Sequence, residues 1–407
     1  MSNAVTQSLR RVAPRHSAPS GLPRGWTGLP GPHNPRTMVG KGVFHSVQAL
    51  RAVAAAVVAL YHSQITFQRA SEVAPGFDTY LFRFGAVGVH IFFVISGFVM
   101  VATTAGKQFR PAAFLRRRLV RIYPIYWVCA AIYVAIYLAF GTPLAMRPDQ
   151  WIGALLLAPP GAGSIIGPGW TLAYEMYFYL CFAAAMAIPR FVPVVTQPMA
   201  NGILAAAFLA CIALRPVVAD GANAWANTAT NPLLLEFLAG TAIGWLVHSG
   251  RLPTRLGGLM VLAGLGIFAL FILVDYDVTT RVVTMGVGSV LIVAGAIGWE
   301  VRSGAGRVTR AVGRLGDSSY ALYLIHIGVL AVLVRWATAA GWHDAAPAWV
   351  IALLLLPVLV ALGEILHRTI ERPLLAILPA RTPFRGDARE PASAAPPPER
   401  TVPREGA

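Results

Sequence analysis

Two residues that could do chemistry interrupt the apolar run SVQALRAVAAAVVALYH at residues 46–62. Arg51 and His62 are 11 residues apart, so on a helix they share one face, about 16 Å apart along the axis. Ionisable groups inside a membrane are costly and usually face a bundle interior or a wet cavity. We therefore predict that this helix forms one wall of a site that reaches through much of the membrane. The alternative for His62 is a purely structural hydrogen bond to Ser63 or Tyr61.

Two carboxylates are candidates to act with His62. Glu175 and Glu236 each stand near the beginning of an apolar run, and we expect both runs to start at the outer membrane surface, at the depth of His62. A histidine near a carboxylate can activate a hydroxyl group by general-base catalysis. Each carboxylate also has a structural interpretation. Glu175 would cap its helix or bond to Trp170 or Tyr174, and Glu236 would be favoured by the helix dipole.

Arginines gather in the stretch FLRRRLVRIYPIYW at residues 114–127. Arg121 follows Arg118 by three residues and Arg117 by four, so a helix can place them on one basic face. Guanidinium groups suit multiply charged phosphate, which makes this face a candidate binding site for a phosphorylated donor. Such runs also serve as topology signals or as contacts to lipid headgroups.

Two further runs contain polar residues. The run at 85–100 includes His90, for which we favour a structural role, and small residues that allow close helix packing. These small residues are Gly85, Gly88, Ser96 and Gly97. The run after Asp317 begins like a capped helix and carries Tyr320, Tyr323 and His326. His326, about two turns into that helix, could be a packing residue.

The composition indicates an integral membrane protein. Of 407 residues, 56% are hydrophobic and only 12% are charged, which is typical of a membrane chain and not of a soluble one. We expect an all-α polytopic fold with about ten transmembrane helices, and a re-entrant or interfacial segment at 151–158. The helices lie near residues 46–67, 86–104, 122–140, 170–188, 201–219, 231–248, 256–274, 282–299, 317–337 and 347–367.

The basic residues predict the orientation of the chain. Most of those between the apolar runs, including the cluster at 114–127, fall on one side. The positive-inside rule places that side, and both termini, in the cytoplasm. We expect residues 46–375 to form the membrane domain, and 1–45 and 376–407 to be disordered cytoplasmic tails. Met38 is an alternative start.

Several other classes of site are disfavoured. The formal charge of +16 does not indicate nucleic-acid binding, because the basic residues fall between apolar runs. The three cysteines have no paired spacing, so we expect neither a disulfide framework nor a metal site. No phosphate-binding loop or dinucleotide fingerprint occurs, so a donor substrate would not be held by a soluble nucleotide fold.

Seven stretches, in their order along the chain, resemble the membrane acyltransferase 3 family. The resemblance is closest to exopolysaccharide O-acetyltransferases of the succinoglycan-modifying type and covers roughly residues 46 to 375. The stretches are LRAVAAAVVALYHS (50–63), GVHIFFVISGFVM (88–100), FLRRRLVRIYPIYW (114–127), WTLAYEMYFYL (170–180), LLEFLAG (234–240), SYALYLIH (319–326) and IERP (370–373).

The resemblance implies an inner-membrane enzyme that moves an acyl group, usually acetyl, from cytoplasmic acyl-coenzyme A to a sugar hydroxyl. The acceptor would be an exopolysaccharide or its lipid-linked precursor, and no cofactor would be permanently bound. The family's histidine and carboxylate fall on His62 and Glu175, and its arginines on Arg51, Arg118 and Arg121. The family usually has an acidic residue where this chain has His90. We also expect supporting or acceptor-side roles for Glu236, Trp170, Tyr174, Ser96, Tyr320 and His326.

In this interpretation His62, oriented by Glu175 or Glu236, deprotonates the sugar hydroxyl, and the donor arm lies along the Arg51–His62 face. Direct transfer and an acyl-enzyme on His62 both remain open. Two alternatives also remain. One is a proton-coupled transporter of an anionic substrate, with His62 and Glu175 as proton relay. The other, within the family, is acylation of a small molecule such as a macrolide or peptide. The oligomeric state is open.

Overall fold

The computed structural model describes residues 44–70, 81–82, 84–141, 146–159, 164–218, 223–271, 278–342 and 346–378. Within these ranges the chain is helical and contains no strand. The predicted tails at 1–45 and 376–407, and the alternative start at Met38, lie almost entirely outside the described residues.

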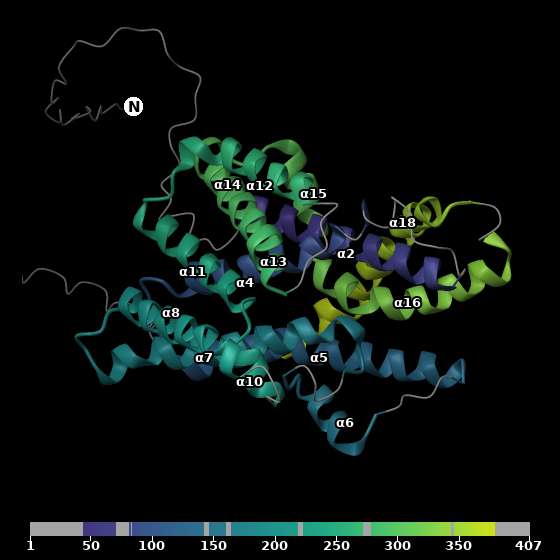
Figure 1. The fold of residues 1–407 in the computed structure, drawn as a ribbon, viewed down its shortest axis with the longest axis horizontal. Coiled ribbons are helices and arrows are strands. Elements are labelled where there is room, and N and C mark those ends of the chain that lie inside the picture. Colours follow the sequence, from purple (N-terminus) through teal and green to yellow (C-terminus); the bar gives the residue numbers. More distant parts are fainter. Residues whose placement is uncertain are drawn as a thin grey trace, which may run out of the picture.

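Each of the ten predicted segments coincides with a helix (Figure 1). These helices are α2 (His45–Ala70), α4 (Val87–Thr104), α5 (Pro111–Ala139), α7 (Trp170–Phe191), α8 (Gln197–Ala213), α11 (Leu234–Ser249), α12 (Gly257–Phe271), α14 (Val287–Ser303), α16 (Ser319–Ala339) and α18 (Ala348–Leu366). Shorter elements connect them: η1 (Phe84–Ala86), α6 (Pro148–Leu155), η2 (Gly167–Gly169), α9 (Arg215–Val218), α10 (Ala224–Ala229), η3 (Thr254–Leu256), α13 (Val278–Arg281), η4 (Val282–Gly286), α15 (Arg307–Leu315), η5 (His367–Glu371) and α19 (Arg372–Ile377).

Seven helical stretches in the described part of the chain are long and apolar enough to cross a membrane. Helices α8, α11 and α12 are shorter, with 17, 16 and 15 residues. Helix α11 and the stretch Thr254–Leu270 are bent by 120° relative to each other and would add one span if they are counted together. The all-helical membrane fold is therefore confirmed, whereas ten crossings and cytoplasmic termini stay predictions.

The basic cluster is part of a helix. We predicted a span beginning near 122, but α5 begins at Pro111, a residue suited to the first helical position. The apolar pattern marks only the apolar part of this helix, which begins eleven residues before it. The arginines at 116–121 therefore have helical spacing, as the sequence predicted.

The segment predicted to be re-entrant or interfacial, 151–158, overlaps the eight-residue helix α6. Its last carbonyl groups accept hydrogen bonds from side chains of α5, because the end of a helix leaves carbonyls without intrahelical partners. The Tyr123 and Tyr126 hydroxyls each donate over 2.6 Å, and the Trp127 indole donates over 3.0 Å. These bonds fix α6 against α5.

Helix α4 packs closely against helices on two sides. A Cβ atom at Gly88 would clash with the backbone carbonyl of Ala54 in α2, and one at Gly97 with the carbonyl of Phe237 in α11. Small residues at such crossings let two helix backbones meet, which confirms the packing role predicted for these glycines. In Figure 1, α4 and α2 lie between the α12–α14 pair and the layer of α5 and α7. Helix α4 thus presents its remaining face, which includes Ser96, to the site.

Candidate active site

A cavity of about 150 Å³ lies among α2, α4, α5, α7 and α16. One part of its wall is apolar and aromatic, and the other part carries three guanidinium groups and one carboxylate. The polar lining residues are Arg51, Ser96, Arg118, Arg121, Thr171, Glu175, Tyr179, Tyr320 and Tyr323. The cavity therefore joins residues from five separate stretches of the sequence.

Arg118 has no carboxylate partner among the described residues. Its guanidinium carbon lies 5.5 Å from the ring centres of both Phe114 and Tyr179. Its Nη2 makes a long contact of 3.5 Å to the Thr103 hydroxyl, and its buried Nε has no hydrogen-bond partner in the described part of the chain. An anion in the cavity could accept hydrogen bonds from the N–H groups of Arg118.

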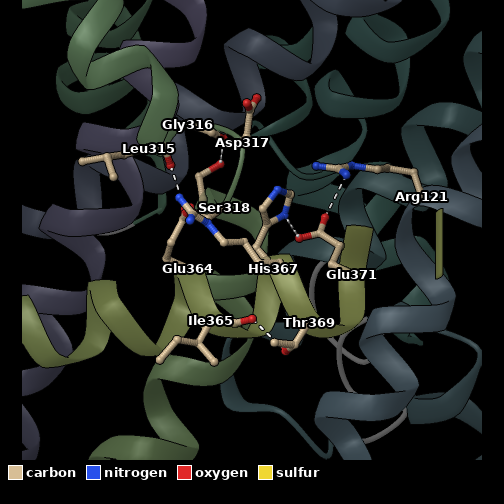
Figure 2. A network of polar contacts seen from close by, with 12 residues as sticks. Arg121, Leu315, Gly316, Asp317, Ser318, Glu364, Ile365, His367, Thr369 and Glu371 are labelled. Atoms are coloured by element: carbon tan, nitrogen blue, oxygen red, sulfur yellow. Dashed lines mark hydrogen bonds and ion pairs between the residues drawn. The ribbon is translucent and has the colours of Figure 1, made fainter. Parts of the chain in front are cut away.

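Arg121, three residues further along α5, is paired with a carboxylate. Its Nη1 lies 2.8 Å from Oε1 of Glu371, and its guanidinium carbon lies 5.7 Å from the Tyr320 ring centre. Glu371 is buried and is also contacted by Nδ1 of His367 at 2.8 Å. Figure 2 shows Arg121 and His367 both directed at Glu371. The π-helical turn η5 carries His367 and Glu371, and such turns often occur at functional sites.

Arg51 reaches the same cavity from α2. Its Nη1 donates to Oε1 of Gln48 over 2.9 Å, and Nε2 of Gln48 donates to Asp317 over 2.7 Å. This chain of contacts links the guanidinium group to the beginning of α16. Gln48 thus connects Arg51 to Asp317, two residues before α16 begins.

Glu175 is held by two hydroxyl groups inside the cavity. Ser96 Oγ donates to Glu175 Oε1 over 2.9 Å, and the Tyr179 hydroxyl donates to the same oxygen. The two hydroxyl oxygens are 3.0 Å apart. We expected Trp170 or Tyr174 as the structural partner, but the bonds come from the next turn of α7 and from α4.

His62 is paired with a second histidine and does not line the cavity. Its Nδ1 lies 3.1 Å from Nε2 of His326, whose Nδ1 lies 2.8 Å from the backbone carbonyl of Tyr323. Tyr320, Tyr323 and His326 follow at intervals of three residues on α16, so they share one face. That face runs from the arginine side of the cavity to His62.

Glu236 belongs to a separate buried cluster. Its Oε1 lies 2.5 Å from Nδ1 of His90, and Nη2 of Arg281 lies 3.4 Å from Nε2 of the same imidazole. The two partners His90 and Glu236 are only 0% and 2% exposed. Gly286, in the π-helical turn η4, leaves room for the carboxylate, because a Cβ atom there would lie 2.8 Å from Oε1. This cluster is not part of the cavity wall.

A family model described as "Acyltransferase domain" matches residues 44–367, most of the chain. The chain belongs to this acyltransferase family. It is an acyltransferase that transfers groups other than aminoacyl groups.

Two relatives resemble this acyltransferase over most of their length. The exopolysaccharide production protein ExoZ of Rhizobium meliloti (strain 1021) is 34% identical over 302 residues, which are 72% of this chain and 90% of the relative. Acyltransferase MdmB of Streptomyces mycarofaciens is 28% identical over 383 residues, which are 83% of this chain and 93% of the relative. No solved structure matches the chain.

The acyltransferase brings about half of the predicted site residues together. Those at the cavity are Arg51, Ser96, Arg118, Arg121, Glu175 and Tyr320. His62 and His326 lie next to the cavity, because His326 contacts the backbone carbonyl of Tyr323, a lining residue. The described contact of His62 is to His326, and the expected pairing with Glu175 or Glu236 is not found. Arg117 is exposed and does not line the cavity.

Two predicted supporting residues lie elsewhere. Trp170 packs on Phe93, with ring centres 6.4 Å apart, and the Tyr174 hydroxyl accepts a hydrogen bond of 2.8 Å from the Asn231 amide. Neither lines the cavity. Both tie α7 to its neighbours.

Tyr179 and Glu371 are polar residues at the site that had no role in the sequence analysis. Tyr179 follows Glu175 by four residues and so lies one turn further on the same face. Glu371 is an acidic residue in the stretch IERP, near the end of an apolar run, and such a position is itself a signal of function. The four-residue spacing from Glu175 could have identified Tyr179. The energetic cost of placing a carboxylate in an apolar run could have identified Glu371.

Among the described residues, no group of three or more His, Cys, Asp or Glu side chains could hold a metal ion. Cys129, Cys181 and Cys211 are free thiols on the helices α5, α7 and α8.

Proposed function

We propose that this acyltransferase moves an acetyl group from acetyl-coenzyme A to a hydroxyl group of an exopolysaccharide or of its lipid-linked precursor. The observation that carries the proposal is the convergence of Arg51, Arg118 and Arg121 on one cavity. An apolar membrane domain has little reason to gather three partly buried guanidinium groups around one cavity unless they bind an anion. Coenzyme A supplies such an anion through its phosphates.

The donor enters from the arginine side. Arg118 is the residue best suited to a phosphate, since it has no carboxylate partner in the described part of the chain and retains an unsatisfied Nε–H. Arg121 is already paired with Glu371, so it would share its charge between that carboxylate and the donor. The narrow arm of the donor then extends along the aromatic wall formed by Tyr320 and Tyr323.

His62 acts on the acceptor. The imidazole removes the proton from the sugar hydroxyl while that oxygen attacks the thioester carbonyl carbon. The tetrahedral intermediate collapses, the C–S bond breaks, and the leaving thiolate takes up the proton held by the His62 imidazolium, which returns to its neutral form. The products are a sugar ester and free coenzyme A thiol. Glu175, held by Ser96 and Tyr179, supplies negative charge inside the cavity.

The acceptor class is supported by the name of one relative, an exopolysaccharide production protein. Sugar hydroxyls of such a glycan, or of its lipid-linked unit, are available at a membrane. The excess of basic residues on the side of Arg116–Arg121 supports a location in the bacterial inner membrane, with the donor taken from the cytoplasm. A soluble donor and a membrane-bound acceptor would then approach the same site from opposite sides.

The experiment is acceptor-dependent release of free thiol from acetyl-coenzyme A by the purified full-length protein in nanodiscs. The acceptor is surface polysaccharide isolated from a strain that lacks this gene. We expect thiol release, and mass spectrometry should find the acetyl ester on the glycan. No thiol release above the protein-free rate would contradict the proposal.

The matched variants are Arg118→Ala and Arg116→Ala. Arg116 belongs to the same arginine run but is exposed and outside the cavity. Losing one charge-assisted hydrogen bond costs about 1.5–3 kcal/mol, so Arg118→Ala should raise the donor KM at least about tenfold. Arg116→Ala should leave it unchanged. Equal donor KM values for both variants would remove the proposed role of Arg118.

A further inference from the structure

The imidazole rings of His62 and His326 are connected by a hydrogen bond between Nδ1 of His62 and Nε2 of His326. We propose that His326 is a positioning residue that holds His62 in the tautomer with hydrogen on Nδ1, so that Nε2 is the proton-accepting atom. The catalytic consequence rests on the proposed function. The tautomer itself follows from the hydrogen bonds around the two rings.

The backbone carbonyl of Tyr323 determines the state of His326. It lies 2.8 Å from Nδ1 of His326, and a carbonyl oxygen can only accept a hydrogen bond. Nδ1 of His326 therefore carries a hydrogen. A bare Nδ1 would place two lone pairs against each other and leave both groups unsatisfied in a buried place, which is costly.

His326 is also neutral. Its side chain is 0% exposed, and no carboxylate contacts it among the described residues. An imidazolium ion there would be a buried charge without a counter-ion, and such charges are strongly unfavourable. A neutral imidazole has only one N–H group, so Nε2 of His326 carries a lone pair.

The state of His62 then follows. Nε2 of His326 can only accept, so Nδ1 of His62, 3.1 Å away, must donate. Neutral His62 therefore has hydrogen on Nδ1 and a lone pair on Nε2. When the acceptor hydroxyl gives its proton to Nε2, the resulting imidazolium keeps its Nδ1–H bond to His326. A neutral imidazole thus occupies the orienting position that a carboxylate holds in Ser-His-Asp sites.

Helix α16 links the His62–His326 pair to the cavity. Tyr323 lines the cavity with its side chain while its carbonyl fixes His326. The Tyr323 hydroxyl is 2.8 Å from that of Thr171, which ties this turn of α16 to α7. The orientation of His62 therefore depends on the wall of the donor cavity.

Activity measurements compare His326→Leu with His326→Gln. Leucine cannot accept a hydrogen bond, whereas the Gln Oε1 can occupy the place of Nε2 and accept from His62. We expect His326→Leu to lower kcat for acyl transfer at least about 10²-fold with little change in donor KM. His326→Gln should stay within about tenfold of the unsubstituted protein. Equal kcat values in the two variants, high or low, would overturn the positioning role.

A second measurement does not depend on activity. Solid-state ¹⁵N NMR of the full-length protein in lipid, with ¹⁵N-labelled histidine, distinguishes protonated from bare ring nitrogens. A His62→Gln sample identifies the two signals of His62. We expect hydrogen on Nδ1 and a bare Nε2 in the unsubstituted protein, and hydrogen on Nε2 would overturn the inference. Absence of thiol release with this tautomer present would instead contradict the proposed function alone.

Discussion

Glu175 depends on two hydroxyl groups for its place in the cavity. Ser96 and Tyr179 both donate to its Oε1, and glutamine could keep these contacts through its amide oxygen while losing the charge. We predict that Glu175→Gln folds normally but loses turnover by at least about 10²-fold. Acyl-transfer kinetics and a thermal unfolding curve of the same sample check this. Full turnover would reduce Glu175 to a structural residue.

The buried pair of His90 and Glu236 has a different consequence. Removing one partner of such a pair leaves the other group buried without compensation, which costs about 3–5 kcal/mol. We predict that His90→Leu lowers the free energy of unfolding by about that amount, and that the double variant with Glu236→Leu is less destabilised. Thermal unfolding in detergent compares the two. A double variant less stable than His90→Leu would show that the single change does not leave the Glu236 carboxylate buried without compensation.

At the level of elements, α4 is positioned by its glycines. Adding a methyl group at Gly97 would force apart the backbones of α4 and α11, and this shift would also move Ser96, the preceding residue, away from Glu175. We predict that Gly97→Ala lowers both the thermal midpoint and acyl transfer. Gly202→Ala on α8 is the control, because no heavy atom lies within 4 Å of a Cβ atom there. It should be neutral or stabilising by a few tenths of a kcal/mol to about 1 kcal/mol. Equal effects of the two changes would contradict this account of the crossing.

Sequence patterns predicted the features that depend on neighbours along the chain. The spacing of Arg118 and Arg121 placed them on one face, and the glycines of α4 marked close crossings. The pairing of His62 could not be predicted, because it depends on how α2 and α16 are rotated about their axes. A helix that is apolar nearly all round gives little information on that rotation. For the same reason, Glu236 and His90 were found separately but not as partners.

At the level of the whole molecule, a donor taken from the cytoplasm requires the arginine side to face the cytoplasm. The test uses a protein whose three cysteines are replaced by alanine, with a single new cysteine at Arg116→Cys or Arg147→Cys. Arg147 is 72% exposed, and it lies between the predicted helices at 122–140 and 170–188, on the side that the predicted orientation places outside the cytoplasm. A maleimide that cannot cross the membrane should label intact cells only at position 147. Labelling at 116 alone would reverse the predicted orientation.

In the proposed mechanism, a donor held by the arginine cavity presents its acyl group to His62. A cryo-EM structure of the protein with a thioether analogue of acetyl-coenzyme A tests it most directly. We predict phosphate density against Arg118 and Arg121, and the acyl carbon at a distance from Nε2 of His62 that leaves room for one hydroxyl group. Phosphates bound elsewhere, or packed side chains between the acyl carbon and His62, would contradict the account.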